Sequence, residues 1–437
     1  MKKTKLYDEI KYELSDRTRA ILVGRYDHNI NIELCNEHLD ELGSLSHTYG
    51  LEVIAKVPCP VHKIDAATFL GKGKIEMLCA QSEELNTDIV IFDDEISPSQ
   101  QRNLERLFHL PIIDRTELIL EIFSQRAHTR EAKLQIELAK NQYQLPRLKR
   151  LWTHLSRQGA SGKGFLKGEG ERQIELDKRM IRNRITYLKK EIEEVKNHRR
   201  VQRISRMRNG IPTFAIVGYT NVGKSTLLRA LTAADVLIED KLFATLDTTT
   251  RKFSLPNHQE ILLADTVGFI RKIPHMLVMA FKSTLEELVY TDILLHLIDV
   301  NHPLAQEHAE STYAVLKELN VEKKPIITVL NKIDLVENQK IVTRFKLTYP
   351  RVVGISAVKK IGFEELMQVM MDVQKGLWKT IKLRIPQKEY ALVSKLIKHG
   401  RLIEQKYEEN DVLLIIEIPD MLECLAKRYV VNASTDT

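Results

Sequence analysis

The sequence predicts a multidomain α/β protein in which parallel sheets are flanked by helices. Strand-like and helical runs alternate over the first 125 residues, and the stretch Gly218–Ser225 reads G-x-x-x-x-G-K-S between a predicted strand and a predicted helix. Further apolar runs of strand length follow that stretch. A chain of 437 residues that is 43% hydrophobic has room for about three domains with cores of their own.

The N-terminal α/β region, residues 1–125, alternates between the two kinds of element. Residues 19–24, 51–55 and 88–92 read as strands, and residues 32–45 and 74–84 read as helices, an order that predicts a parallel sheet with helical crossovers. Gly71-Lys72-Gly73-Lys74 lacks the full signature of a phosphate-binding loop, and we interpret it as a turn that caps a helix. Asp93-Asp94-Glu95 has the ligands for a metal, but we favour a solvated acidic loop.

The middle region, residues 126–210, predicts an antiparallel helical hairpin. Two apolar seams with heptad spacing are joined by the Gly-rich stretch 158–170, which contains too many glycines for a helix. Pro146 predicts a kink in the first helix. A disordered linker would explain the glycines but not their position between matched seams. The seams consist of Leu134, Leu138, Asn141, Leu145, Leu148, Trp152 and Leu155, and of Ile181, Ile185, Leu188, Ile192 and Val195.

The positive charge of the chain is concentrated in this hairpin. Residues 145–210 contain 19 Lys and Arg against 7 Asp and Glu, a net of +12 in a chain whose total is +7. Such a surplus is typical of a surface that binds a polyanion, although a solvated helical face has the same composition. The residues Lys163, Phe165 and Lys167 lie in the Gly-rich link, where an aromatic ring flanked by cations is suited to stacking on an RNA base.

The stretch Gly218–Ser225 has the pattern of a phosphate-binding loop. Its glycines allow backbone N–H groups to turn toward phosphate oxygens, and the start of the following helix also favours an anion. Lys224 supplies a cation for the β- and γ-phosphates, and the hydroxyl of Ser225 is a ligand for Mg²⁺. A chance Gly-rich turn would not explain the strand before it and the helix after it.

Four further motifs in residues 211–377 follow in the order expected of a GTPase. Thr245 lies in the segment 242–251 and is our choice for a second hydroxyl on Mg²⁺, whereas Asp265 would hold the ion through water. Asp334 has the carboxylate that pairs with N1–H and the 2-amino group of guanine, and adenine would leave that carboxylate unpaired. The residues that we expect to bind GTP are Gly218, Tyr219, Thr220, Asn221, Val222, Gly223, Lys224, Ser225, Phe243, Ala244, Thr245, Leu246, Asp247, Asp265, Thr266, Val267, Gly268, Asn331, Lys332, Ile333, Asp334, Ser356 and Ala357.

Phe269 follows Asp265-Thr266-Val267-Gly268 at the position where many GTPases have a glutamine that orients the attacking water. A phenyl ring cannot orient water, so the catalytic residue of hydrolysis is not identified by the sequence. We expect slow intrinsic hydrolysis unless a partner or another residue supplies the missing group.

The C-terminal region, residues 378–437, predicts a small α+β domain. Residues 381–385, 402–407 and 412–416 read as strands, and residues 390–399 and 420–429 read as helices. The cysteines Cys35, Cys59, Cys79 and Cys424 are scattered without metal-ligand spacing, which predicts free thiols. The chain has no signal peptide or membrane-spanning run, which predicts a cytoplasmic protein, with peripheral membrane association left open.

The chain resembles the HflX family of ribosome-associated GTPases in the Obg–HflX group along nearly its whole length. The resemblance is carried by the stretches 70–74, 97–105, 113–120 and 134–139 in addition to the nucleotide motifs. In the Gly-rich link, Glu169 stands where the family has proline, and Thr248 is a similar replacement after the segment Phe243–Asp247.

The resemblance implies a GTPase that requires Mg²⁺ and binds the large ribosomal subunit, with the hairpin directed toward the peptidyl-transferase centre. It also implies GTP-dependent splitting of stalled or idle ribosomes and contacts between the C-terminal domain and ribosomal proteins. Separately, we expect the free protein to be a monomer. The alternatives are an NTP-dependent enzyme that remodels ribosomal RNA, a ribosome-assembly GTPase, and a GTP-switched scaffold for a membrane protease, which would not bind ribosomes.

Overall fold

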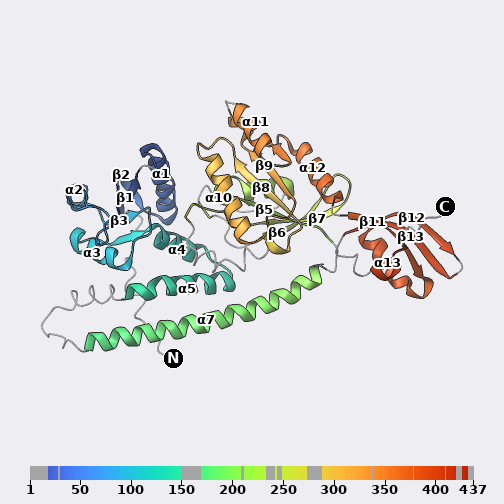
Figure 1. The fold of residues 1–437 in the computed structure, drawn as a ribbon, viewed down its shortest axis with the longest axis horizontal. Helices are drawn as coiled ribbons and strands as arrows, with labels where there is room; N and C mark the ends of the chain where they lie inside the picture. The colour runs from blue at the N-terminus through green and yellow to red at the C-terminus, as the bar shows by residue number, and fades with distance from the viewer. Residues whose placement is uncertain are drawn as a thin grey trace. The chain divides into compact units, whose positions relative to one another are not determined.

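Figure 1 shows the fold of the chain in a computed structural model. The structure describes residues 18–27, 30–148, 169–207, 211–232, 242–243, 249–272, 288–336, 339–376, 378–408, 410–419 and 426–431. Its internal contacts divide the chain into two compact units. Unit 1 comprises Met1–Glu193, Glu239–Leu246 and Lys272–Lys282, and unit 2 comprises Glu194–Ile238, Asp247–Arg271 and Ser283–Thr437. The division of the sequence into four domains stays a prediction.

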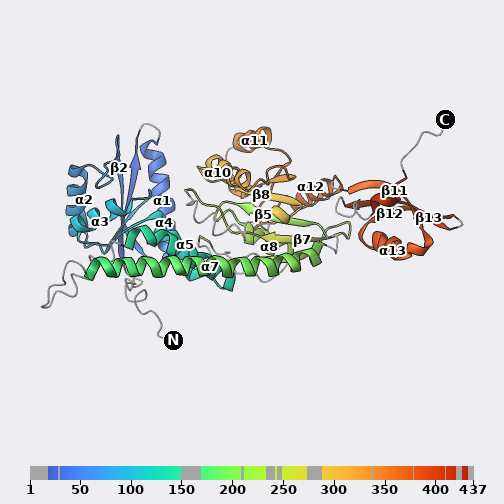
Figure 2. The same ribbon diagram turned by 60° about the horizontal axis from the view of Figure 1, so that its bottom comes forward.

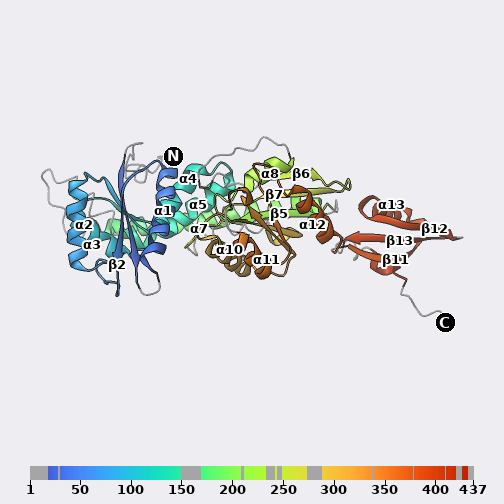
Figure 3. The same cartoon turned by 90° about the horizontal axis from the view of Figure 1, so that it is seen from above.

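Unit 1 contains the predicted parallel sheet, with strands in the order β2-β1-β3-β4. Helices α1 and α4 lie on one side of this sheet, and α2 and α3 lie on the other (Figures 2 and 3). The apolar core under α2 and α3 includes Ile75, Phe92 and Leu104. The elements are β1 (Arg19–Tyr26), α1 (Ile32–Tyr49), β2 (Glu52–Pro60), α2 (Lys72–Glu84), β3 (Ile89–Phe92), α3 (Pro98–Phe108), β4 (Ile112–Asp114) and α4 (Arg115–Arg126).

Local capping explains where several of these helices begin. Gly71 is the N-cap residue of α2, as predicted, but Lys72, Gly73 and Lys74 belong to the first turn of the helix and not to the preceding turn. Ser97 and Gln100 form a reciprocal capping box at the start of α3, followed by Pro98 in the first turn. Asp114 ends β4 and caps α4 by accepting a hydrogen bond from Glu117 N. Helices α3 and α4 were not among the predicted elements.

The acidic run after β3 is not a solvated loop, contrary to our prediction. Asp93 is buried, and its carboxylate lies 3.0 Å from Nη1 of Arg115 and 3.2 Å from Nζ of Lys272. Arg115 is itself buried and forms a second ion pair with Glu41 at 2.6 Å. A buried carboxylate requires such partners because an unpaired charge away from water is costly. The local sequence gave no sign of them, since both partners lie far along the chain.

The predicted hairpin is present as the helices α5 (Arg130–Gln144) and α7 (Glu169–Met207), which lie side by side in Figures 1 and 2. Ion pairs Arg130–Glu191 and Glu137–Arg184 fix the antiparallel direction. The predicted seam of α7 is confirmed, because Ile181, Leu188 and Ile192 are buried and Ile185 and Val195 are partly buried. The helix begins at Glu169, within the stretch that we predicted to be non-helical.

The first seam is confirmed only in part. Leu148 is buried, but Leu134, Leu138, Asn141 and Leu145 are only partly buried, while Ile136 and Tyr143 on another face are deeply buried. This helix therefore packs on the rest of unit 1 as well as on α7. The kink predicted at Pro146 is instead the end of α5 at Gln144, followed by the 3₁₀ turn η1 (Leu145–Arg147). Trp152, Leu155, Lys163, Phe165 and Lys167 lie outside the described residues.

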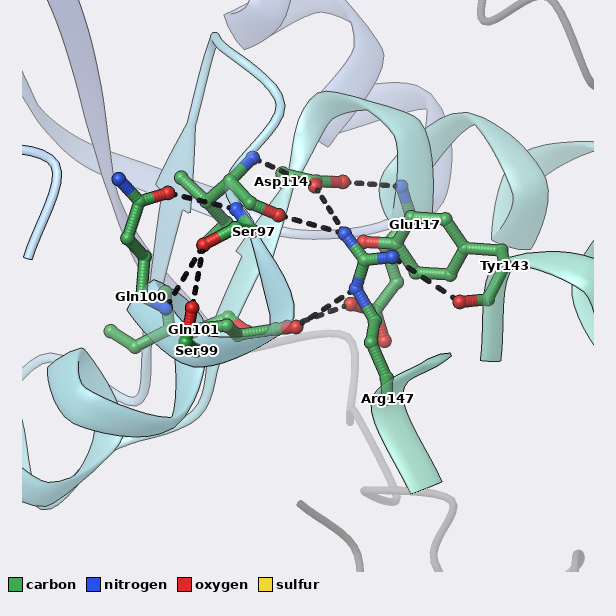
Figure 4. Close-up of polar contacts among 10 residues, drawn as sticks. Ser97, Ser99, Gln100, Gln101, Asp114, Glu117, Tyr143 and Arg147 are labelled. Atoms are coloured by element: carbon green, nitrogen blue, oxygen red, sulfur yellow. Dashed lines mark hydrogen bonds and ion pairs between the residues drawn. The ribbon is translucent and has the colours of Figure 1, made fainter. Parts of the chain in front are cut away.

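A buried polar junction around Arg147 joins η1 to the sheet of unit 1 (Figure 4). The Arg147 guanidinium donates to Gln101 Oε1 at 3.1 Å and to Ile96 O at 2.8 Å, and it lies 3.6 Å from the ring centroid of Tyr143. It also lies 3.5 Å from the carboxylate of Asp114. Burial raises the pKa of this carboxyl group to about 6. The junction fixes the end of α5 against β4 and α3.

Unit 2 contains a six-stranded sheet in the order β10-β9-β8-β5-β7-β6, parallel except for β6. Helices α8 and α12 lie on one side of it, and α10 and α11 lie on the other (Figure 3). The elements are β5 (Thr213–Gly218), α8 (Lys224–Thr232), β6 (Thr249–Ser254), β7 (Glu260–Asp265), β8 (Ile293–Asp299), α10 (Ala305–Glu318), β9 (Ile326–Asn331), η2 (Ile333–Leu335), α11 (Gln339–Thr348), β10 (Val352–Gly354) and α12 (Phe363–Lys375).

The C-terminal region of unit 2 forms the predicted α+β module, in which a three-stranded antiparallel sheet has the order β11-β13-β12. Its core includes Leu383, Val393 and Ile416. The elements are β11 (Trp378–Pro386), η3 (Gln387–Glu389), α13 (Tyr390–His399), β12 (Arg401–Glu408), β13 (Asp411–Pro419) and η4 (Lys427–Tyr429). Most of the helix predicted over residues 420–429 lies outside the described residues.

Cys35, Cys59 and Cys79 are free thiols, as predicted, and Cys424 lies outside the described residues. Burial raises the pKa of the Cys35 thiol to about 11, which disfavours its thiolate form at neutral pH. Among the helices that the structure describes, none combines the length and hydrophobicity needed to span a lipid bilayer.

Candidate nucleotide-binding site

The predicted nucleotide-binding residues meet at one edge of the sheet of unit 2. The strands β5, β7, β8 and β9 are parallel neighbours, so the segments that follow their carboxyl ends lie side by side. These segments are the loop Gly218–Ser225 after β5, Asp265–Gly268 at the end of β7, and Asn331–Asp334 at the end of β9. An open edge of this kind is where ligands bind in α/β sheets.

The loop Gly218–Ser225 connects β5 directly to α8, as its sequence predicted. Gly223 has φ of +94°, and a Cβ atom added there would lie 2.5 Å from Asn331 Nδ2. A Cβ at Gly218 would lie 2.4 Å from Leu297 O. Both positions therefore require glycine, because a side chain at either one would collide with a neighbouring group. The positive φ of Gly223 is a second reason at that position.

Lys224 is buried at the base of the loop and donates to the carbonyl oxygens of Tyr219 at 2.6 Å and Gly218 at 3.3 Å. Burial lowers the pKa of Lys224 to about 8, and the nearby carboxylate of Asp265 opposes that shift. These carbonyl contacts hold the ammonium group at the base of the loop. A phosphate group offers it stronger, charged acceptors.

Ser225 and Asp265 form the pair predicted for a divalent cation. The Ser225 hydroxyl donates to Asp265 Oδ2 at 2.7 Å, and Asp265 is fully buried. A hydroxyl beside a buried carboxylate fits Mg²⁺, which prefers hard oxygen ligands and binds proteins through few of them. Within the described part of the chain, no cluster of three or more His, Cys, Asp or Glu side chains offers an alternative metal site.

Asn331 links three of the predicted motifs. Its Nδ2 donates to Val222 O at 2.7 Å, and its Oδ1 accepts a hydrogen bond from Ala357 N at 3.0 Å. The phosphate-binding loop and the Ser356-Ala357 segment are thus held in place by one buried amide. The pair Ser356-Ala357 follows β10, as predicted.

Asp334, at the end of the Asn331–Asp334 segment, is held by neighbouring polar groups. A hydrogen bond from Ser356 and one from Lys359 lower the pKa of the Asp334 carboxyl group. Lys359 Nζ lies 3.0 Å from Asp334 Oδ2. The Lys332 backbone has φ of +64°, and its Nζ lies 2.7 Å from Asp299 Oδ2.

Two residues that were not predicted, Asp299 and His308, also lie beside the nucleotide motifs. Asp299 ends β8 at the same sheet edge as the other motifs. In the sequence, only its position after an apolar run indicated a place in the site. His308 of α10 stacks on Tyr219, with ring centroids 3.6 Å apart and planes 5° from parallel. The hydroxyl of Tyr219 accepts a hydrogen bond from Arg271 N at 2.6 Å.

Phe269, which replaces the usual water-orienting glutamine, is 2% exposed and contributes its backbone to the site. Phe269 N donates to Gly218 O at 3.0 Å, and Thr220 N donates to Phe269 O at 2.8 Å. Ala244, Thr245, Leu246 and Asp247 lie outside the described residues, so their predicted roles stay predictions. Phe243 is described and lies in unit 1 rather than unit 2.

Comparisons with protein families cover most of the chain. Residues 36–124 match the family described as GTP-binding GTPase N-terminal, and residues 126–206 match GTP-binding GTPase Middle Region. Residues 213–332 match the family described as 50S ribosome-binding GTPase. The three matches together extend from the first α/β region through the nucleotide motifs.

Known relatives are similar over nearly the whole chain. The chain is 47% identical to GTPase HflX of Chlamydia pneumoniae, over 93% of this chain and 87% of the relative. It is 40% identical to GTPase HflX of Escherichia coli, over 87% of this chain and 89% of the relative. The GDP complex of a GTP-binding protein from Sulfolobus solfataricus is 28% identical, with a TM-score of 0.43, over 82% of this chain and 99% of that one.

Proposed function

The chain belongs to the HflX family of GTPases, and we propose that it binds the large ribosomal subunit and dissociates stalled or idle ribosomes into subunits. GTP binding drives the dissociation, and the ribosome stimulates hydrolysis. The observation that carries the proposal is the union, in one chain, of a guanine-nucleotide site with a basic helical pair. A match to the family described as 50S ribosome-binding GTPase gives further support.

The nucleotide site accounts for the guanine preference and for phosphate binding. Asp334 accepts hydrogen bonds from N1–H and the 2-amino group of guanine, and Asn331 holds the loop in position below it. Lys224 exchanges its contacts with the carbonyls of the loop for the β- and γ-phosphates. Gly268 offers its N–H to the γ-phosphate, so the segment after β7 responds to the presence of that group.

We assign Mg²⁺ to Ser225 and Asp265 because the structure brings their oxygens together. The ion would neutralise charge on the phosphate oxygens during hydrolysis. Thr245 is the third residue of the proposed set. Ser225 would bind directly through its hydroxyl group, whereas Asp265 would act through water.

Slow hydrolysis by the free protein follows from Phe269. Its phenyl ring has no polar group to orient water, and the ring is buried. Its backbone N–H and carbonyl groups are already hydrogen-bonded to Gly218 and Thr220. We infer that the ribosome supplies or orders the missing group. Turnover should therefore depend on the large subunit, as in GTPases whose partner completes the catalytic site.

The helical pair supplies the affinity for RNA in this proposal. Exposed basic residues of α7 include Arg179, Arg182, Lys189 and Lys190, on a helix whose apolar seam faces its neighbours. Phosphate contacts by such residues release counterions, so binding should weaken as salt rises. Lys163, Phe165 and Lys167 are proposed to reach ribosomal RNA near the peptidyl-transferase centre, and a cytoplasmic location follows from the same partner.

Sedimentation with purified large subunits tests the proposal. The protein should co-sediment with them in the presence of a non-hydrolysable GTP analogue and less with GDP, and added subunits should raise GTP turnover. Light scattering of intact ribosomes should fall when the protein and GTP are added. Failure to bind subunits would favour the GTP-switched scaffold, and strand separation without subunit splitting would favour the RNA-remodelling enzyme.

A further inference from the structure

Strand β12 is an open edge of the sheet in the C-terminal module (Figure 3). The strands have the order β11-β13-β12, so only one side of β12 is paired. The opposite edge, β11, is partly covered, because Val431 N donates to Lys382 O at 2.9 Å. Among the residues that the structure describes, no strand or bridge lies along the outer side of β12. Such an edge can pair with another strand.

The backbone groups of Gln405 and Tyr407 face this open side. Gln387 N, just after β11, donates to Asn410 O at 2.8 Å, so the even-numbered residues of β13 bond toward β11 and the odd-numbered ones toward β12. The residues of β12 that lie opposite the odd-numbered residues of β13 are Glu404, Lys406 and Glu408. Because the bonding direction alternates along an antiparallel strand, the residues between them point away from β13.

The side chains of Glu404 and Lys406 lie on the face of the sheet away from the core of the module. That core contains the even-numbered residues of β13, whereas these two side chains lie opposite odd-numbered ones. They are 45% and 68% exposed, and Lys406 Nζ lies 2.6 Å from Glu404 Oε1 in the same strand. Charges on an edge strand usually oppose pairing, so the groups that they meet decide whether a second strand can bind.

A second copy of β12 meets these charges with opposite ones. A two-fold axis makes the two strands antiparallel. With the axis at Gln405, Glu404 lies opposite Lys406 of the second copy, and the same pair recurs on the other side of the axis. Opposite charges across two strands stabilise the pairing. Tyr407 and Ile403, which are 61% and 53% exposed, also lie opposite each other in this register, so that pairing removes apolar surface from water.

The same charges disfavour the other registers. The outward bonding of alternate residues allows the axis to move along β12 in steps of one residue. An axis at Glu404 or at Lys406 places that side chain against the identical charge of the second copy, which is destabilising. An axis nearer either end of β12 shortens the overlap and leaves Glu404 or Lys406 without its opposite charge. The charges therefore select the register centred on Gln405.

We propose that β12 pairs with β12 of a second copy of this chain, antiparallel and centred on Gln405, which joins two three-stranded sheets into one. The contact is short, and small interfaces are weak, so the dissociation constant should be on the order of 10 µM. Below that concentration the chain is a monomer, the state that we expect from its sequence. The nucleotide motifs take no part in this contact, which goes beyond the proposed function.

Sedimentation equilibrium of the full chain between about 1 and 200 µM tests the pairing. The weight-average mass of the parent should rise with concentration from the 50.5 kDa of one chain toward twice that value. Lys406→Glu and Glu404→Lys each turn both opposite-charge pairs into like-charge pairs, so each variant alone should associate about tenfold more weakly. An equimolar mixture of the two variants restores both opposite-charge pairs and should dimerise as tightly as the parent.

Lys427→Glu is the matched control, because it reverses an exposed lysine of the same module in η4, just before the segment that covers β11. It should associate like the parent. A parent that stays monomeric at about 200 µM would overturn the proposal, and so would single variants that associate as tightly as the parent. A mixture that does not recover association would show that the strands do not meet in this register, which overturns it as well. Neither nucleotide nor ribosome is present, so each of these results leaves the proposed function unchanged.

Discussion

The side-chain amide of Asn331 donates to the backbone carbonyl of Val222 at 2.7 Å, although the two residues are 109 positions apart in the chain. The other end of the same amide accepts from Ala357 N. One buried residue, 2% exposed, thus connects the phosphate-binding loop with two segments of the base site. The nucleotide site is therefore sensitive to anything that displaces Asn331.

Gly223→Ala should displace Asn331 and weaken nucleotide binding. The new Cβ would lie 2.5 Å from Asn331 Nδ2, and φ of +94° is strained for alanine. Losing buried hydrogen bonds costs about 1–3 kcal/mol, so GDP affinity should fall by about five- to 150-fold. A fluorescent GDP titration measures it. Gly73→Ala, where a Cβ meets nothing within 4 Å, is the control and should bind GDP normally.

Asp334→Asn should exchange guanine for xanthine recognition. An amide cannot accept from both N1–H and the 2-amino group, but it can donate to the 2-oxo group of xanthine. We expect GTP affinity to fall by about 2 kcal/mol or more and xanthosine triphosphate affinity to rise. Competition between the two nucleotides measures both changes. Unchanged GTP affinity would show that Asp334 does not contact the base.

Lys224→Ala and Ser225→Ala should reduce GTP turnover by about a hundredfold or more, because the first removes the phosphate cation and the second removes the Mg²⁺ hydroxyl. Turnover is measured with saturating large subunits, so that reduced ribosome binding does not limit the rate. For Ser225→Ala, raising the Mg²⁺ concentration should recover part of the loss. Turnover equal to that of the parent protein would contradict the assignments.

Replacement of Lys163 by Ala, Phe165 by Ser and Lys167 by Ala should reduce ribosome splitting by about tenfold and leave free GTP affinity nearly unchanged. GTP affinity should not change, because the three residues are far in sequence from every nucleotide motif. Splitting should fall, because stacking of one base alone contributes about 1–3 kcal/mol. Light scattering of intact ribosomes measures splitting. Undiminished splitting would place the contact with RNA elsewhere, for example on α7.

His296 should make the stability of unit 2 depend on pH. Burial lowers the pKa of His296 to about 3, from an unfolded value near 6.5. The unfolded chain therefore binds a proton that the folded chain does not, and stability is lost as pH falls below about 6.5. Between pH 7 and pH 5 the loss from this residue is about 2 kcal/mol.

Urea unfolding of the parent protein and of His296→Phe at both pH values isolates that contribution. The ring of His296 packs edge-on against Tyr313, with centroids 4.9 Å apart, so phenylalanine preserves the shape. The variant should lose about 2 kcal/mol less than the parent between pH 7 and pH 5. An equal loss in both proteins would show that His296 is accessible to protons in the folded state.

The sequence by itself determined many of the elements and the nucleotide motifs of this protein, although not the helices α3 and α4. Strands such as Ile326–Asn331 and the seam of α7 follow from the spacing of apolar residues, which is a local property of the chain. The loop Gly218–Ser225 and Asp334 follow short strands, so their meeting at one sheet edge required only that the strands be parallel neighbours.

Only the tertiary structure decided which distant residues pair. Asp93 belongs to an acidic run that reads as solvated, yet it is buried against Arg115, 22 positions away, and Lys272, 179 positions away. Arg147 and Phe243 likewise find their partners in other elements of unit 1. Such contacts leave no periodic pattern, because the free energy that keeps a buried charge paired depends on where the folded backbone brings its partner.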